Sequence, residues 1–146
     1  MPEFWLSLGS NIQPEKNIPA CMKALREKFK GIKVSSIYET DPVGPAGTRK
    51  FWNAGVIVNT PLGREAFQKE IAAVEAALGR RRDPADKFAP REIDIDILPQ
   101  PGYQQFGFCV LPLAEIMPET HDPETGKTFR DLAAILPSAG IKKLSF

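Results

Sequence analysis

Long apolar runs, a cysteine framework and a large net charge are all missing from this 146-residue sequence. No segment approaches the ~18 consecutive apolar residues that a membrane-spanning helix needs, so we expect no membrane partner. Cys21 and Cys109 are too few for a disulfide framework, and we expect two buried thiols in a reducing compartment. The first residues show no basic segment followed by an apolar core. The sequence therefore predicts no secretory leader and a cytoplasmic protein.

The sequence also has little net charge and few candidate catalytic nucleophiles. The formal net charge is +1, which is too small for bulk attraction to nucleic acid. Only residues 80–91 form a basic cluster. The lone His121 lies in a turn-like context, and we interpret it as a surface residue. The chain contains no G-x-x-x-x-G-K-[S/T] loop, so it is not a P-loop enzyme, and its residues assemble no serine or cysteine catalytic triad.

The hydrophobic patterns predict a single domain over residues 1–146. In chain order we expect strand 3–9, helix 17–31, strands 32–40 and 51–60, helix 64–79, strand 91–98, a turn at 99–105, a short strand at 106–111, a helical turn at 112–118 and a last helix at 128–136. Asn17 is expected to cap the first helix, and Gly31 and Gly79 to end the two long helices. This order predicts an α+β fold with a ferredoxin-like βαββαβ core, a largely antiparallel sheet, both long helices on one face and a small C-terminal extension.

Apolar and acidic residues alternate along the strand predicted at 91–98. Side chains alternate across a strand, so one face should carry Ile93, Ile95 and Ile97 and the other Glu92, Asp94 and Asp96. Two carboxylates about 6 Å apart repel by roughly 2–3 kcal/mol at an effective dielectric near 20, and a cation removes that cost. Mg²⁺ suits such a pair, because it takes one or two carboxylates and completes its shell with water and phosphate oxygens. The alternative is an amphipathic strand whose acidic face is merely solvated.

The basic cluster at 80–91 comes directly before the acidic strand. Arginines bind phosphate oxygens in pairs, so arginines beside a metal site are what a polyphosphate requires. The alternative is a solubilising surface that is partly paired with Asp83 and Asp86. Arg91 follows Pro90 and is expected on the same face of the strand as the three isoleucines. It can therefore serve an acidic site on the opposite face only from the end of the strand.

The stretch KFAPREIDIDIL (87–98) resembles the signature of the 6-hydroxymethyl-7,8-dihydropterin pyrophosphokinase family of folate biosynthesis. Further segments resemble that family in the same order: LSLGSN (6–11), VSSIYETDPVG (34–44), FWNAGVIV (51–58), EAALGRRR (75–82) and GFCVLPLAEIMPE (107–119). The resemblance covers nearly the whole chain. It implies a transferase that moves the pyrophosphoryl group of ATP to the hydroxymethyl group of the pterin and releases AMP. It also implies two Mg²⁺ ions, ATP and a pterin as small-molecule partners, and a protein that we expect to be a monomer.

The resemblance assigns roles to particular residues. The metal ligands are Asp94 and Asp96, and the catalytic residues that grip the transferring phosphates are Arg82 and Arg91. The nucleotide site comprises Glu75, Lys87, Arg82 and Arg91. The pterin site comprises Thr40, Pro42, Val43 and Asn53, with Phe108 stacked on the ring. Without the resemblance, Phe108 is equally compatible with the core, whereas an asparagine inside a strand already favours a ligand because a buried amide needs partners.

The chain departs from the family between the signature strand and GF at 107–108. Only residues 99–106 join them, with no histidine or arginine, and Phe106 stands where a phosphate-gripping arginine is expected. Phe88 replaces a tryptophan. A catalytically weakened pterin-binding paralogue, or a pyrophosphokinase for a related pterin, is therefore the alternative. A nucleic-acid-binding module that uses the basic cluster is disfavoured by the near-neutral charge. We also expect loop 80–90, with loop 41–50, to close over Mg-ATP as a lid.

Overall fold

A computed structural model describes residues 3–40, 50–79, 93–136 and 140–144, and one antiparallel sheet runs through it. Its strands are β1 (Glu3–Ser10), β2 (Gly31–Val34), β3 (Tyr38–Thr40), β4 (Phe51–Asn59), β5 (Asp94–Leu98) and β6 (Ile141–Lys143). The order is β5-β1-β4-β3-β6, and β2 also pairs with β4. Because β4 is antiparallel to both β1 and β2, these two are parallel to each other on either side of it. This is the split βαβ arrangement, so the predicted ferredoxin-like α+β core is confirmed.

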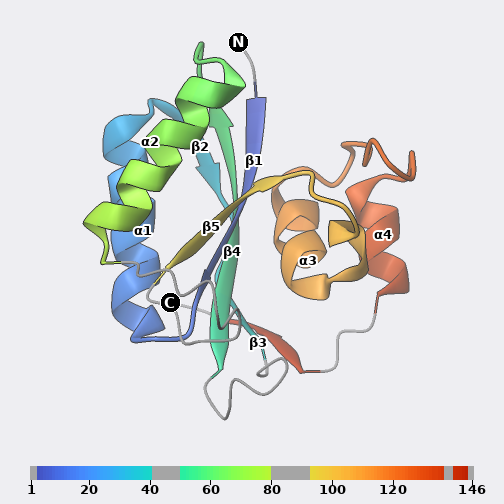
Figure 1. Cartoon of the computed structure of the whole chain (residues 1–146). Helices are drawn as coiled ribbons and strands as arrows, with labels where there is room; N and C mark the ends of the chain where they lie inside the picture. The colour runs from blue at the N-terminus through green and yellow to red at the C-terminus, as the bar shows by residue number, and fades with distance from the viewer. Residues whose placement is uncertain (1–2, 41–49, 80–92, 137–139, 145–146) are drawn as a thin grey trace.

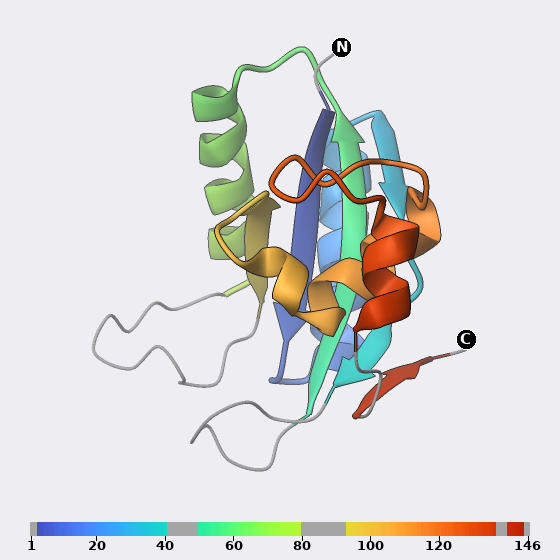
Figure 2. The same cartoon turned by 90° about the vertical axis from the view of Figure 1, so that its right-hand side faces the viewer.

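Helices cover both faces of the sheet. Helices α1 (Pro14–Lys28) and α2 (Arg64–Ala77) lie on one face, and α3 (Gly107–Ile116) and α4 (Phe129–Ile135) lie on the other (Figure 1). The predicted apolar stripes of the two long helices are buried against the first face, among them Ile18, Leu25, Phe67, Ile71 and Val74. A second core lies under α3 and α4. These two helices face the viewer in Figure 2. None of the helices in the described ranges is long and apolar enough to span a membrane.

The predicted ends of the first helix are wrong. The helix begins three residues earlier, at Pro14, because proline fits the first turn of a helix, where its missing N–H costs nothing. Asn17 is therefore a buried residue inside α1, and its Nδ2 donates to the Ile12 carbonyl at 2.6 Å. Gly31 opens β2 instead of ending the helix. For α2 the prediction is confirmed, since Gly79 has φ 88° directly after the C-cap Leu78.

The strand predicted over 32–40 is interrupted, and the interruption has a structural role. Val34 pairs with Val56 and Tyr38 pairs with Asn53, so the chain advances four residues here while β4 advances three. The extra residue makes this break a β-bulge. Without it, Val34 and Tyr38 would share a face, because strand side chains repeat every two residues. With it, Val34 packs against the core of α1 and α2 while Tyr38 faces α3.

The short strand predicted at 106–111 is wrong, because Gly107–Ile116 form helix α3. A short apolar run cannot be assigned to a strand or to a buried helix by periodicity alone. Helix α3 packs directly on β4 at Gly55: a Cβ there would lie 3.0 Å from Pro112 Cβ and 3.3 Å from Leu113 Cδ2. A glycine in the central strand thus lets the helix approach the sheet closely. The turn predicted at 99–105 ends in a 3-10 turn, Tyr103–Gln105, and β6 was not predicted.

Candidate active site

A pocket of about 270 Å³ lies on the α3 face of the sheet. Five residues that the sequence assigns to a site line it together: Thr40, Asn53, Asp94, Asp96 and Phe108. Four further residues that were not assigned complete the lining: Ser7, Gly9, Phe51 and Phe106. The pocket therefore joins the predicted metal pair to the predicted pterin-binding residues.

A row of paired residues across three strands forms the floor of the pocket. Gly9 of β1 pairs with Asn53 of β4 on one side and with Asp94 of β5 on the other. Opposed residues of antiparallel strands point to the same face, and neighbouring strands lie about 4.8 Å apart, so Asn53 and Asp94 are separated by about 10 Å. A Cβ at Gly9 would lie 3.3 Å from Asn53 Oδ1. The missing side chain keeps the space between the amide and the carboxylate open.

Asp94 and Asp96 stand on this floor, and the predicted alternation of β5 is confirmed. Both aspartates are half-buried and line the pocket, whereas Ile93 and Ile95 are buried in the core of α1 and α2. Helix α3 covers part of this face, so the aspartates line a pocket instead of the merely solvated face that was the alternative. Within the described ranges, no three acidic, histidine or cysteine residues gather into a metal cluster. A pair of carboxylates is the donor set that Mg²⁺ uses when phosphates and waters supply the other ligands.

The negative charges of Asp94 and Asp96 affect Cys109 of α3, the helix that lies beside the pocket. Cys109 Sγ lies 3.7 Å from Ser7 Oγ in the buried contact between α3 and β1. Burial raises the pKa of the Cys109 thiol to about 11; the hydrogen bond with Ser7 opposes this, and the negative charges of Asp96 and Asp94 add to it. The thiol is therefore protonated at neutral pH. Cys21 is also free and buried, so the expectation of two buried thiols is confirmed.

Asn53 and Thr40 form a buried polar pair at the other end of the floor. Asn53 Nδ2 donates to Thr40 Oγ1 at 2.9 Å, and both residues are buried. The amide thus has a partner within the protein, which fixes its orientation in the pocket wall. Thr40 lies on this face because the extra residue in the bulge before Tyr38 reverses the face of the sheet to which each β3 side chain points.

Aromatic rings close the side of the pocket that faces α3. The rings of Phe106 and Phe108 stack with centroids 5.3 Å apart and an interplanar angle of 29°. Phe108 is half-buried and also packs on the core under α3, whereas Phe106 is 48% exposed. Phe51 adds a ring from β4. The position at which the family resemblance implied an arginine therefore carries an apolar ring stacked on Phe108.

Glu75 lies behind β5, away from the pocket residues. It is buried, and its Oε2 accepts a hydrogen bond from the Ile95 N–H at 2.9 Å. Burial and then the charge of Glu75 raise the pKa of Cys21, a buried residue of α1, so this carboxylate faces the α1 and α2 side of the sheet. Among the described residues, Glu75 is not part of the pocket lining. Its nucleotide-binding role stays a prediction.

Several predicted site residues lie outside the described residues. These are Pro42, Val43, Arg82, Lys87 and Arg91, together with both loops of the expected lid. His121 is described, and it is an exposed residue whose Nδ1 lies 3.0 Å from the Gly126 carbonyl oxygen, as expected of a surface histidine.

Different signals could have identified the four unassigned lining residues. Phe51 precedes Asn53 by two positions, so the strand period alone places both on one face. Ser7 and Gly9 enter the pocket through their pairing with β5, which the sequence does not specify. Phe106 was noted only as a missing arginine, because the 106–111 segment was taken for a strand.

Comparison with known proteins places the chain in a family. The family model described as 7,8-dihydro-6-hydroxymethylpterin-pyrophosphokinase matches residues 5–118. A Pseudomonas aeruginosa protein named 2-amino-4-hydroxy-6-hydroxymethyldihydropteridine pyrophosphokinase is 30% identical over 96% of this chain and 95% of its own. Proteins of the same name from Methylorubrum extorquens and Bacillus subtilis are each 32% identical, over 99% of both chains in the first case and over 83% of this chain and 81% of the relative in the second. The chain therefore belongs to the 7,8-dihydro-6-hydroxymethylpterin-pyrophosphokinase family of enzymes.

Proposed function

We propose that this chain transfers the pyrophosphoryl group of ATP to 6-hydroxymethyl-7,8-dihydropterin in folate biosynthesis, with Mg²⁺ bound at Asp94 and Asp96. The observation that carries the proposal is the pocket itself. It holds an acidic pair at one end of its floor and a buried amide with aromatic rings at the other. The names of the relatives give the same reaction class.

The reaction requires positioning more than a chemically active side chain. The hydroxymethyl oxygen forms a bond to the β-phosphorus of ATP, the bond from that phosphorus to the bridging oxygen of the α-phosphate breaks, and AMP leaves with the electron pair. The hydroxyl proton is released. Catalysis of such a transfer is chiefly alignment and neutralisation of phosphate charge.

The pterin end of the pocket supplies orientation. A pterin is a flat heteroaromatic ring with hydrogen-bonding groups along one edge. Asn53, held by Thr40, offers amide groups to that edge, and Phe108 and Phe51 offer ring faces for stacking. With its edge at Asn53, the pterin lies along the floor and its hydroxymethyl group points toward Asp94, about 10 Å away.

The acidic end of the pocket supplies the metal site. Asp94 and Asp96 would hold Mg²⁺, which neutralises phosphate charge when it is bound. Two ions, as the family resemblance implies, would share these carboxylates. Arg82, Arg91 and Lys87 remain the predicted phosphate ligands, and Glu75 a predicted nucleotide residue.

The direct test is AMP release from Mg-ATP in the presence of the reduced hydroxymethylpterin. We expect AMP and the pterin diphosphate from the wild-type protein and none above background from the Asp94→Asn/Asp96→Asn variant. Asp131→Asn is a matched control, because Asp131 lies in the first turn of α4, away from the pocket lining. Release of ADP, or turnover that survives in the double variant, would contradict the proposal.

The ring of Phe106 favours a second candidate, a pterin-binding paralogue with weakened catalysis or with a related pterin as substrate. An apolar ring in place of an arginine removes one charged phosphate contact, which costs a few kcal/mol of transition-state stabilisation. Pterin binding without AMP release, restored by Phe106→Arg, would identify this candidate.

We also propose that residues 1–146 act as one domain and as a monomer. The support for one domain is that β1, near residue 3, and β6, near residue 143, belong to the same sheet. Sedimentation at increasing protein concentration checks the monomer: a rise in molar mass would contradict it.

A further inference from the structure

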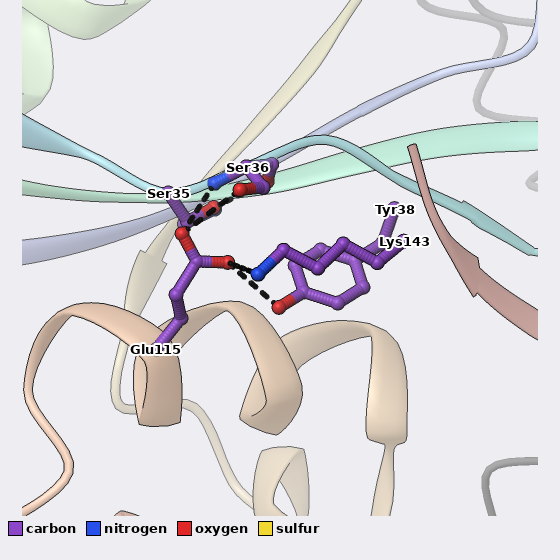
Figure 3. A network of polar contacts seen from close by, with 6 residues as sticks. Ser35, Ser36, Tyr38, Glu115 and Lys143 are labelled. Carbon is purple, nitrogen blue, oxygen red and sulfur yellow. Dashed lines mark hydrogen bonds and ion pairs between the residues drawn. The ribbon is translucent and has the colours of Figure 1, made fainter. Parts of the chain in front are cut away.

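A single carboxylate on α3 joins three separate segments of the chain. Glu115 Oε2 accepts hydrogen bonds from the Ser36 N–H at 2.8 Å and from the Ser36 hydroxyl at 3.0 Å. Its Oε1 accepts from the Tyr38 hydroxyl at 2.7 Å and lies 3.7 Å from Lys143 Nζ of β6. Figure 3 shows the Glu115 side chain extending from α3 toward these donors. Glu115 thus links α3 to the bulge between β2 and β3.

The carboxylate binds the bulge that orients the pocket wall. The bulge leaves the Ser36 N–H without a place in the β4 ladder, and Glu115 accepts from it. Ser35 stays on β4, since its N–H donates to the Gly55 carbonyl and its hydroxyl accepts from the Gly55 N–H. Two residues after Tyr38, Thr40 contacts Asn53. Glu115 therefore holds the segment that brings Thr40 to the pocket.

The same helix carries the ring that faces the pterin. Phe108, Pro112 and Glu115 are spaced four and three residues apart, so they lie along one stripe of α3. Phe108 lines the pocket, Pro112 packs at Gly55 and Glu115 reaches the bulge. At 1.5 Å per residue, Glu115 is about 10 Å along the helix axis from Phe108. Pro112 makes the apolar attachment to the sheet, and Glu115 makes the polar attachment at the far end.

We propose that Glu115 is a positioning residue for the pterin: by binding Ser36 and Tyr38 it fixes α3 against the β2–β3 bulge and so sets the spacing between Phe108 and the Asn53–Thr40 pair. This rests on the proposed function for the identity of the ligand. Glu115 does not line the pocket, so it acts through Phe108 and Thr40. The stacking wall and the hydrogen-bonding wall belong to different elements, and their spacing decides how a flat ring fits between them.

The principal test measures KM and kcat separately for the pterin and for ATP. In Glu115→Ala, Ser36 and Tyr38 lose a charged acceptor, and we expect the pterin KM to rise roughly tenfold, with kcat and the ATP KM each changed less than about threefold. Glu115→Gln should restore most of the affinity, because its carbonyl oxygen accepts from Ser36 and its amide donates to Tyr38 Oη. A pterin KM that is unchanged in Glu115→Ala, or a Gln variant as impaired as the Ala variant, overturns the proposal.

Matched variants separate positioning from general loss of structure. Glu119 is a nearby carboxylate that pairs with Arg130 of α4 and does not contact the bulge, so Glu119→Ala should leave both KM values unchanged. Tyr38→Phe removes one hydrogen bond and keeps the ring, and we expect a rise of about threefold in the pterin KM. This milder variant decides the question if Glu115→Ala does not fold. An unchanged pterin KM in Tyr38→Phe then counts against the proposal.

A readout without substrate keeps this inference separate from the proposed function. Cys109 follows Phe108 on α3 and is buried against Ser7, so loosening of the helix exposes its thiol. We expect a thiol reagent to label Cys109 about tenfold faster in Glu115→Ala than in the wild type or in Glu119→Ala, with peptide mapping to separate it from Cys21. Equal labelling rates would show that Glu115 does not hold α3. If the wild type releases no AMP, the proposed function fails, whereas the labelling result still decides whether Glu115 fixes the helix.

Discussion

The two faces of the sheet are built for different purposes. On one face, α1 and α2 cover a continuous apolar layer in which Phe67 stacks on Phe4 with ring centroids 4.0 Å apart. On the other, the short helices α3 and α4 cover a smaller core, and a pocket with two carboxylates and a buried amide lies beside α3. Strand β5 shows the difference within five residues, since its isoleucine at 95 is buried and its aspartates line the pocket.

Along the same strands, residues on the face under α1 and α2 should contribute mainly to stability, and residues on the pocket face mainly to function. The closed face buries large side chains completely, so substitutions there should act on folding. Around the pocket, the α3 face leaves rings and charges half-covered, so substitutions at the pocket should act on ligands. Three pairs of variants or conditions test this division.

The largest expected difference is between two phenylalanines. Phe67 is fully buried, and Phe67→Ala should lower the free energy of unfolding by about 3–5 kcal/mol through lost burial and a cavity. Phe108 is half-buried, and Phe108→Ala should cost about 1 kcal/mol while raising the pterin KM. Urea unfolding and steady-state kinetics measure both. Equal stability losses for the two variants would remove the proposed division.

The second comparison is between two carboxylates on opposite sides of β5. Asp96→Asn weakens the metal site and should lower kcat by roughly 10²- to 10³-fold with little loss of stability. Glu75→Gln keeps an acceptor for the Ile95 N–H and removes the charge. If Glu75 has its predicted nucleotide role, the ATP KM will rise in this variant; a loss of stability with an unchanged ATP KM would restrict Glu75 to holding β5.

The smallest effect is a pH dependence on the α3 face. Partial burial acts to raise the pKa of Glu115, but hydrogen bonds from Tyr38 and Ser36 and the charge of Lys143 outweigh it, so the pKa lies below its ordinary value of 4.5. The stabilisation by this carboxylate is therefore complete above pH 4.5 and is lost as the pH falls through the lowered folded-state pKa. The wild type should exceed Glu115→Gln in free energy of unfolding at pH 6, and the gap should shrink by pH 3. A constant gap in urea titrations from pH 6 to 3 would show that the charge of Glu115 contributes nothing.

The sequence predicted those features that depend on local periodicity. The alternation of Ile95 with Asp94 and Asp96 is set by the strand repeat, and the buried stripes of α1 and α2 by the helical repeat. The first half of helix α3 was missed, and only its end was predicted as a helical turn, because Phe108–Leu113 is apolar on every side, as a helix buried between a sheet and a second helix can be. The break at Ser36 was missed because the pattern of β-branched and aromatic residues continues across it.

Local physics thus determined the two long helices, the strands β1, β4 and β5, the βαββαβ order and the acidic pair, and the family resemblance supplied the chemistry. Only the tertiary structure decided that Asn53, Gly9 and Asp94 form one row, because strand register depends on pairing between distant segments. It also decided that Tyr38 and Thr40 face α3, since one extra residue in the bulge reverses the side-chain parity of β3. Glu115 binds that bulge from the helix that carries Phe108, a contact between residues 79 positions apart in the chain that no local pattern encodes.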